Sequence, residues 1–321
     1  MIHRDKLKGR DVMIEVAMMI EGQDGLTWER WMQIARMVED LGFVGLYRSD
    51  HFTNTRPPHK DSLELWVSLT WLAGHTKRIE FGPLVTPASF RHPVFTARTG
   101  KDVDDLSSGR LTLGIGAGWQ EHEHEVFGFD LLPVRERFDR FEENVKVITQ
   151  LLQAEEPVDF DGNYYTLKGA ELLPRPSRPG GPPVLIGGNG PNRTLPLTAQ
   201  YADEWNGVFI GPEEYGDLNA RLDELIDEHG RERDDVRRSI MTGLVYGNVR
   251  ADLERRASLY SAGPQELRER GLVVGGPQEV VDRLGAYADA GAQRIMLQWL
   301  DTEDLSGIEH FASNVLPQVH K

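Results

Sequence analysis

An acidic residue and a histidine, Asp50-His51, follow a short apolar run and are the first candidates for chemistry. Histidine titrates close to neutral pH, so it can donate or accept a proton, and a neighbouring carboxylate changes its pKa. The same pair could form an ordinary ion pair at the start of a loop, and the sequence leaves both interpretations open. We predict that Asp50 and His51 are catalytic residues, acting in proton transfer or in a hydrogen bond to a polar ring edge.

A glycine-rich segment, Gly187-Gly188-Asn189-Gly190, is the second candidate. Residues that are free to adopt positive φ can turn successive backbone N–H groups toward one anion, and a helix that begins just after them adds its positive end. The hydroxyl of Thr194 could contribute as well. These features predict a phosphate site, with a tight turn that binds nothing as the alternative. No Lys-Ser or Lys-Thr pair follows the glycines, which excludes a Walker loop.

A second glycine run, Gly114-Ile-Gly116-Ala117-Gly118-Trp119, has part of the spacing of a dinucleotide-binding fingerprint. Its third glycine comes one position early, and Trp119 stands where close packing of a helix needs a small residue. We therefore reject NAD binding of the Rossmann type. The run still allows a planar ligand to approach the backbone closely.

The acidic and histidine-rich segment that follows, residues 121–125, has the residue types of a metal site. Two histidines separated by one residue converge on a metal only in a strand, and this segment is predicted to be a loop or the start of a helix. We expect no metal here.

Short β-branched or apolar runs alternate with amphipathic stretches along the chain, which is typical of βα units around a parallel sheet. In the first unit Thr27 can cap a helix whose apolar residues recur at helical spacing, and Gly42 can end it. Eight strands, each followed by a helix, predict an α/β fold, a closed (β/α)8 TIM barrel. The predicted strands are 12–20, 43–47, 78–86, 110–115, 183–187, 204–210, 239–247 and 293–299. Helices after the first are predicted at 61–75, 93–107, 135–153, 192–202, 212–228, 277–290 and 302–316.

Two segments exceed this scheme, one after strand four and one after strand seven. Residues 154–182 and 250–275 are long for loops in a compact domain, so we interpret both as insertions that could form a lid. No Gly/Ser-rich linker divides the chain, so we expect residues 1–321 to form a single barrel domain. Active-site residues of such a barrel lie where strands end and βα loops begin, and the candidate residues above are at those places.

Composition limits the class of protein further. The chain has 36 Lys+Arg and 51 Asp+Glu, a formal net charge of −15, which argues against a nucleic-acid surface. Cysteine is absent, which removes disulfides, thiolate metal sites and Cys nucleophiles together. The N-terminal residues are polar and the apolar run after them contains Glu15, so we expect no signal peptide, no membrane association and a cytoplasmic protein.

Six ordered motifs together resemble the bacterial luciferase-like family, and in particular its flavin and deazaflavin (coenzyme F-420) oxidoreductases. The resemblance extends from the first predicted strand to the last. The motifs are Gly22-Gln23-Asp24-Gly25, Arg48-Ser49-Asp50-His51-Phe52, Gly82-Pro83-Leu84-Val85-Thr86-Pro87 with Phe90-Arg91-His92-Pro93, Asp105-Leu106-Ser107-Ser108-Gly109-Arg110-Leu111, Gly114-Ile115-Gly116-Ala117-Gly118-Trp119, and Leu185-Ile186-Gly187-Gly188-Asn189-Gly190-Pro191.

The resemblance implies a homodimeric barrel that holds the coenzyme at its C-terminal face. It places Asp50 and His51 beside the redox ring and Leu84 and Val85 in a bulge of strand three. Family members often carry a non-proline cis peptide in this bulge, at Pro83–Leu84 or at Leu84–Val85 in this numbering.

The glycine runs receive roles from the same resemblance. Residues Gly116, Ala117 and Gly118 would flank the ring, and residues 187–190 would hold the coenzyme phosphate. Several deazaflavin dehydrogenases carry a glutamate directly after the Gly-x-Gly of strand four, where this chain has Ala117, Gly118 and then Trp119. The proton-donor role of that glutamate therefore does not transfer, and Glu121 or Glu123 could replace it from farther along the loop. We take Glu121 as the third catalytic candidate.

Three functions remain open. The first is a hydride-transferring oxidoreductase that uses coenzyme F-420 on a small organic substrate, together with a separate reductase that supplies reduced coenzyme. The second is an FMN-dependent monooxygenase, and the third is a barrel that binds a flavin without catalysis. In the first two the coenzyme carries the redox chemistry and the barrel positions it.

Overall fold

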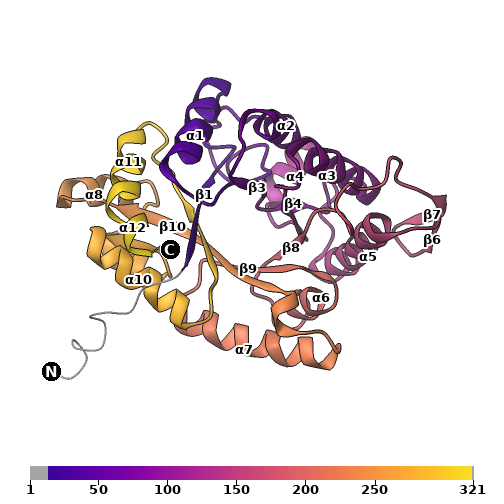
Figure 1. Ribbon diagram of the computed structural model, residues 1–321. Coiled ribbons are helices and arrows are strands. Elements are labelled where there is room, and N and C mark those ends of the chain that lie inside the picture. The colour runs from indigo at the N-terminus through magenta and orange to yellow at the C-terminus, as the bar shows by residue number, and fades with distance from the viewer. Residues whose placement is uncertain (1–13, 320–321) are drawn as a thin grey trace.

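The computed structural model describes residues 14–319 and shows a ring of parallel strands surrounded by helices (Figure 1). Hydrogen-bonded neighbours follow the order β3-β2-β1-β12-β10-β9-β8-β5-β4, and a bridge between Phe81 and Leu111 joins β3 to the segment just before β5. Because β3 and β4 are two halves of one strand position, the path closes on itself. The predicted (β/α)8 barrel is confirmed. Its strands are β1 (Glu15–Ile20), β2 (Gly45–Arg48), β3 (Glu80–Pro83), β4 (Thr86–Pro87), β5 (Leu113–Gly116), β8 (Val184–Gly187), β9 (Glu204–Val208), β10 (Arg237–Tyr246) and β12 (Arg294–Gln298).

The helices lie close to their predicted positions. Helix α1 shows why: the Thr27 side chain accepts a hydrogen bond from the N–H of Arg30 at 3.3 Å, and Gly42 ends the helix with φ of 91°. Residues 12 and 13, the start of the first predicted strand, lie outside the described residues. The helices are α1 (Trp28–Leu41), α2 (Leu65–His75), α3 (Pro93–Ser107), α4 (Glu121–Phe127), α5 (Val134–Gln153), α6 (Thr194–Tyr201), α7 (Pro212–Glu228), α8 (Arg250–Ser258), α9 (Pro264–Glu269), α10 (Pro277–Asp289), α11 (Leu305–Asn314) and α12 (Leu316–Val319), with a short 3-10 turn at Arg233–Asp235.

The main core fills the space between the strands and the surrounding helices. A separate apolar cluster, which includes Met19, Leu84 and Met241, lies inside the ring of strands. The core therefore closes the barrel interior below the ends of the strands, where the loops begin. No helix within residues 14–319 is long and apolar enough to span a membrane.

Strand three is interrupted at Leu84–Val85, which is a cis peptide bond that does not involve proline. The sequence left two bonds open, and the structure places the cis bond at the second of them. Neighbouring glycines leave room for this bulge. A Cβ on Gly114 would lie 2.1 Å from the carbonyl oxygen of Pro83, and a Cβ on Gly116 would lie 2.6 Å from a methyl group of Val85. Part of the glycine run is therefore explained by packing against strand three.

The two insertions differ in position. The first contains the hairpin β6 (Val158–Asp161) and β7 (Thr166–Ala170), which lies outside α5 at the periphery of the barrel (Figure 1). None of its residues lines the cavities at the carboxyl ends of the strands, so the lid interpretation is wrong for this hairpin. The second contains α8, α9 and β11 (Val273–Gly275), and its residues Tyr260, Arg270 and Leu272 do line a cavity there.

The close contact between Gly114 of β5 and Pro83 of β3 generates a stability prediction. We expect Gly114→Ala to lower the free energy of unfolding by about 1–3 kcal/mol, because the new methyl group forces two backbones apart. The matched control is Gly74→Ala in α2, where a Cβ meets nothing within 4 Å, and where alanine should stabilise the helix by about 0.5–1 kcal/mol. Urea unfolding of both variants measures the difference. Equal stability of the two variants would contradict the tight packing described above.

Candidate active site

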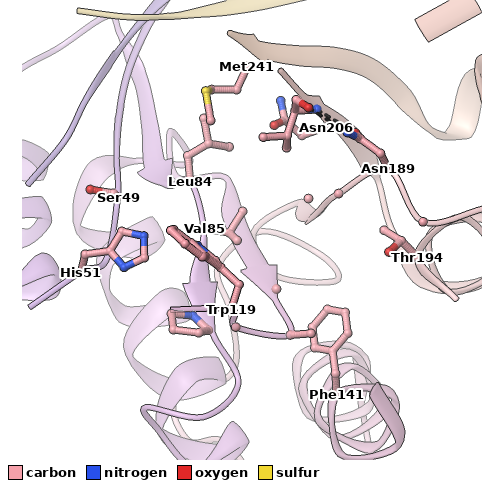
Figure 2. Close-up of a pocket in the computed structure, with 18 of the residues that line it drawn as sticks. Ser49, His51, Leu84, Val85, Trp119, Phe141, Asn189, Thr194, Asn206 and Met241 are labelled. Atoms are coloured by element: carbon pink, nitrogen blue, oxygen red, sulfur yellow. Dashed lines mark hydrogen bonds between the residues drawn. The ribbon is translucent and has the colours of Figure 1, made fainter. Parts of the chain in front are cut away.

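A cavity of about 600 Å³ opens at the carboxyl ends of the strands (Figure 2). Figure 2 shows His51 and Trp119 on one side of it, Leu84 and Val85 between, and the segment of Asn189 and Thr194 on the other side. We call this the main cavity. Of the residues predicted from the sequence, those that line it are His51, Leu84, Val85, Gly116, Ala117, Gly118, Gly187, Gly188, Asn189, Gly190 and Thr194.

The imidazole of His51 is held by Glu123 of α4. The distance from His51 Nδ1 to Glu123 Oε1 is 2.8 Å, and the backbone N–H of Phe52 donates to the other carboxylate oxygen at 3.0 Å. The Glu123 side chain is 1% exposed and that of His51 is 16% exposed. Both residues belong to the lining of the cavity, and the histidine is the more exposed of the two.

This hydrogen bond determines what His51 can do. A carboxylate only accepts, so Nδ1 carries the hydrogen and Nε2 is left to face a ligand as an acceptor when the ring is neutral or as a donor when it is protonated. Burial opposes protonation of the ring, but the hydrogen bond and charge of Glu123 outweigh it, with help from Glu21 and Asp50, and the pKa of His51 lies above its ordinary value. The arrangement can supply a proton from Nε2 or take one there.

Aromatic packing positions both residues of this pair. Trp119 meets His51 edge to face, with ring centroids 5.6 Å apart. Behind them the Phe52 ring contacts Phe90 at 5.1 Å and Phe127 at 4.9 Å between centroids. The aromatic contacts anchor α4 against the loop after β2 and so keep Glu123 within reach of His51.

Asp50 does not line the main cavity. Its carboxylate is buried and accepts a hydrogen bond from Thr86 Oγ1 at 2.6 Å. The same carboxylate forms an ion pair with Arg91. Arg91 also pairs with Glu64 at 2.7 Å. The structure thus places the Asp50 carboxylate outside the lining of the main cavity, where it links β2 to strand three through Thr86. Its predicted place beside the ring stays a prediction.

Glu121 is also placed differently from the prediction. It is exposed at the first turn of α4 and lines neither cavity, whereas Glu123 and His124 point inward. Because the segment is helical, residues two positions apart face different directions. His124 Nε2 contacts Ser89 Oγ at 2.7 Å. Within residues 14–319 no group of three or more acidic or histidine side chains could hold a metal ion.

The middle of the main cavity offers an apolar wall. Leu84 and Val85 form it together with Met19 and Met241 from the interior of the barrel. A flat ring can pack against these side chains, and the polar groups of the cavity lie on either side of them. Residues 116–118 line the same wall, which fits the sequence prediction for a planar ligand.

The glycine-rich loop after β8 forms the far side. Only Gly188 of its glycines has positive φ, at 131°, so the predicted mechanism of several such residues is wrong. The Asn189 side chain is occupied by the backbone of Val208, to which it donates at 2.7 Å and from which it accepts at 2.9 Å. Among the described hydrogen bonds, none uses the backbone N–H of Asn189 or of Gly190. Those two amides and the hydroxyl of the buried Thr194 are among the groups available to an anion.

A second cavity of about 490 Å³ adjoins the first. Glu21, His51, Trp119 and Phe209 line both cavities. Most of the residues that line the second cavity are of polar type, although apolar atoms make up the larger part of its wall. Arg270 is one of the lining residues, and it forms no ion pair among the described residues. A ligand in the second cavity and a ring in the main cavity would meet beside His51.

Comparison with known proteins identifies this arrangement. A family model described as luciferase-like monooxygenase matches residues 13–264. The chain belongs to the luciferase-like monooxygenase family. The predicted family is thus confirmed, and the match includes His51, the strand-three bulge and the glycine-rich loop.

Individual relatives of this luciferase-like chain are informative. An F-420-dependent glucose-6-phosphate dehydrogenase from Amycolatopsis mediterranei (strain U-32) is 29% identical over 322 residues, covering 90% of this chain and 93% of the relative. A solved F-420-dependent secondary alcohol dehydrogenase in complex with an F-420-acetone adduct has a TM-score of 0.81 at 20% identity, covering 96% of this chain and 100% of that one. Monooxygenase RslO1 from Streptomyces bottropensis has a TM-score of 0.79 at 19% identity, covering 95% and 99%. The two structural similarities establish the fold alone.

Sequence reasoning missed two features of the luciferase-like site. The first is the choice between Glu121 and Glu123: both were offered and Glu121 was taken, but Glu123 meets His51, as the helical phase of residues 121–127 could have indicated. The second is Glu21, which directly follows the first strand and to which the sequence assigned no role. Its proximity to His51 follows from the direct parallel pairing of β1 with β2, which brings the ends of the two strands together.

The His51 and Glu123 pair generates a pH prediction. We expect the pKa of His51, measured by NMR of its ring protons, to lie above 6.5 and to fall in Glu123→Gln, because the variant removes the negative charge. Since the folded pKa is raised, the stabilisation by the pair is fully present below about pH 6.5 and is lost as the pH rises through the folded value.

Glu125→Gln is the matched control, because Glu125 is exposed on the same helix. The His51 titration should keep its midpoint in that variant. A midpoint that is the same in the wild type and in Glu123→Gln would exclude Glu123 as the partner that stabilises the protonated ring.

Proposed function

We propose that this luciferase-like barrel is an oxidoreductase that uses coenzyme F-420 to transfer hydride to or from a small organic substrate. The observation that carries the proposal is the pair of His51 and Glu123 at the edge of a cavity whose wall is the Leu84–Val85 bulge. The relatives favour this coenzyme, since the dehydrogenase from Amycolatopsis mediterranei is named for its dependence on F-420 over nearly the same length.

The residues present fit the coenzyme. The apolar wall formed by Leu84, Val85 and Met241 suits the flat ring, and the free amides of Asn189 and Gly190 suit an anionic tail. The start of α6 directs the positive end of a helix toward the same place, and the Thr194 hydroxyl lies beside it. Charged side chains are not needed at this anion site because backbone dipoles supply the positive potential.

When bound, the coenzyme would accept or deliver the hydride, since amino-acid side chains are poor hydride carriers. The part left to the protein is the accompanying proton. His51 Nε2 would take the proton of a hydroxyl that is being oxidised, or return one to a carbonyl oxygen that is being reduced, while Nδ1 stays bonded to Glu123. Trp119, which lies against His51 and is 60% exposed, would limit access of water to that nitrogen.

An FMN-dependent monooxygenase is the second candidate, favoured by the likeness to monooxygenase RslO1. The apolar wall accepts the ring of either coenzyme, so the wall does not choose between them. A barrel that binds a flavin without catalysis is the third candidate. The second cavity argues against it, because a storage protein needs no further compartment beside the ring.

The proposal extends to the oligomeric state of the protein and to the supply of coenzyme in the required redox state. Exposed apolar side chains on the adjacent helices α2 and α3, such as Val67 and Phe95, favour a homodimer that covers them. Each turnover leaves the coenzyme in its other redox state, so a separate reductase, or another F-420 enzyme, has to restore it. The predicted cytoplasmic location belongs to the same proposal.

Separate titrations of the purified protein with coenzyme F-420 and with FMN test the function. We expect tight binding of F-420, followed by the change in its absorbance and fluorescence, and much weaker binding of FMN. A Thr194→Val variant should weaken F-420 binding about 10-fold through loss of one hydrogen bond to a charged group.

The outcome that reverses the ranking is tight binding of FMN with no spectral response to F-420. Glu125→Gln serves again as control, since this exposed residue lines neither cavity. Its affinity for F-420 should equal that of the wild type.

A further inference from the structure

A carboxylate without a cationic partner lies where the two cavities meet. Glu21 follows β1 and lines both cavities. Two glutamine amides hold it: Gln23 Nε2 donates to Oε2 at 2.8 Å, and Gln298 Nε2 donates to Oε1. No ion pair of the described residues includes Glu21. Among the described residues no cation is in direct contact with the Glu21 carboxylate, and its charge acts on Arg48 and His51 from a greater distance.

Both amides are themselves fixed in orientation. The Gln23 carbonyl oxygen accepts a hydrogen bond from Ser49 Oγ at 2.7 Å, and the Gln298 carbonyl oxygen accepts one from the Tyr260 hydroxyl at 3.0 Å. Each amide therefore has its NH2 group turned toward Glu21. Gln23 and Gln298 are buried, so the network forms a rigid support from β1, β2, β12 and the second insertion.

The two glutamine amides leave part of the hydrogen-bond acceptor capacity of the Glu21 carboxylate unused. Each oxygen of a carboxylate can accept about two hydrogen bonds, and each oxygen of Glu21 receives one from the network. The remaining lone pairs belong to a group that accepts and never donates. A ligand atom that meets them has to carry a hydrogen, and for a carboxylate a hydroxyl or an ammonium is the matching group.

We propose that Glu21 recognises a hydrogen-bond donor of the substrate, a hydroxyl or a protonated amine, held in the second cavity next to His51. This assignment rests on the proposed function, in which the same cavity receives the substrate. Glu21 and His51 line the same two cavities, so a donor held by Glu21 lies beside the nitrogen that exchanges the proton. Substrates that lack the donor are rejected because the lone pairs would lose water without gaining a partner.

Binding of paired compounds tests the assignment without turnover. The probes are propan-2-ol with 2-methoxypropane, and glucose 6-phosphate with its methyl glucoside, so that each hydroxyl compound has an ether in which one donor is blocked. Dissociation constants are measured by ligand-observed NMR titration of the full chain, with and without oxidised coenzyme F-420. In the wild type we expect at least one hydroxyl compound to bind about 10- to 100-fold more tightly than its ether, the range of a hydrogen bond to a charged group.

Two variants separate recognition from support. Glu21→Gln should bring the ratio within each pair to about 3-fold or less, and Glu21→Asp, which keeps the carboxylate, should retain part of the preference. Glu125→Gln should keep the wild-type ratio. All variants should bind F-420 with wild-type affinity, because Glu21 would contact the substrate and not the coenzyme.

The outcomes are distinguishable. Loss of F-420 binding by Glu21→Gln would overturn the assignment by placing Glu21 in the coenzyme site. No preference in any wild-type pair, or an unchanged preference in Glu21→Gln, would overturn it too. A wild-type protein that distinguishes the pairs but does not bind F-420 would support the role of Glu21 and contradict the proposed function.

Discussion

The hydrogen bond between His51 Nδ1 and Glu123 is the interaction on which the chemistry of this barrel depends. It joins the loop after β2 to α4, two segments far apart in the sequence, and it assigns the hydrogen to one ring nitrogen so that the other faces the cavity. Without the buried carboxylate, desolvation would favour a neutral ring whose two tautomers compete. The aromatic contacts of Phe52 and Trp119 serve this one bond by keeping α4 in place.

The shape of the cavity follows from a second constraint, the break in strand three. The neighbouring strand β5 has no room for side chains where the bulge at Leu84–Val85 packs against it. This accounts for the glycines at positions 114 and 116 of β5. The bulge pushes Leu84 and Val85 into the interior and so converts the end of a closed barrel into an apolar wall for a ring. The far half of the strand is supported by the ion pair of Asp50 and Arg91, since the Thr86 hydroxyl donates a hydrogen bond to Asp50 and accepts one from Arg91.

The barrel was predictable because each strand and helix has its own periodic pattern and end signals, as Thr27 and Gly42 show for α1. Residues after strand ends were correctly brought to one cavity, since barrel topology alone places them there. The direction of individual side chains was not predictable. Asp50 lies outside the lining of the main cavity while His51 faces it, and the choice between Glu121 and Glu123 depends on where α4 starts and on what packs behind it. Such choices are made by contacts between distant segments.

A crystal structure of the protein with oxidised coenzyme F-420 tests this arrangement most directly. The structure is expected to show the redox ring against Leu84 and Val85, one ring edge facing Nε2 of His51, and an anionic group of the tail at the amides of residues 189 and 190. His51 should keep its hydrogen bond to Glu123 in the complex. A coenzyme bound outside the main cavity, or a His51 ring turned away from both Glu123 and the coenzyme, would contradict the central role assigned to this pair.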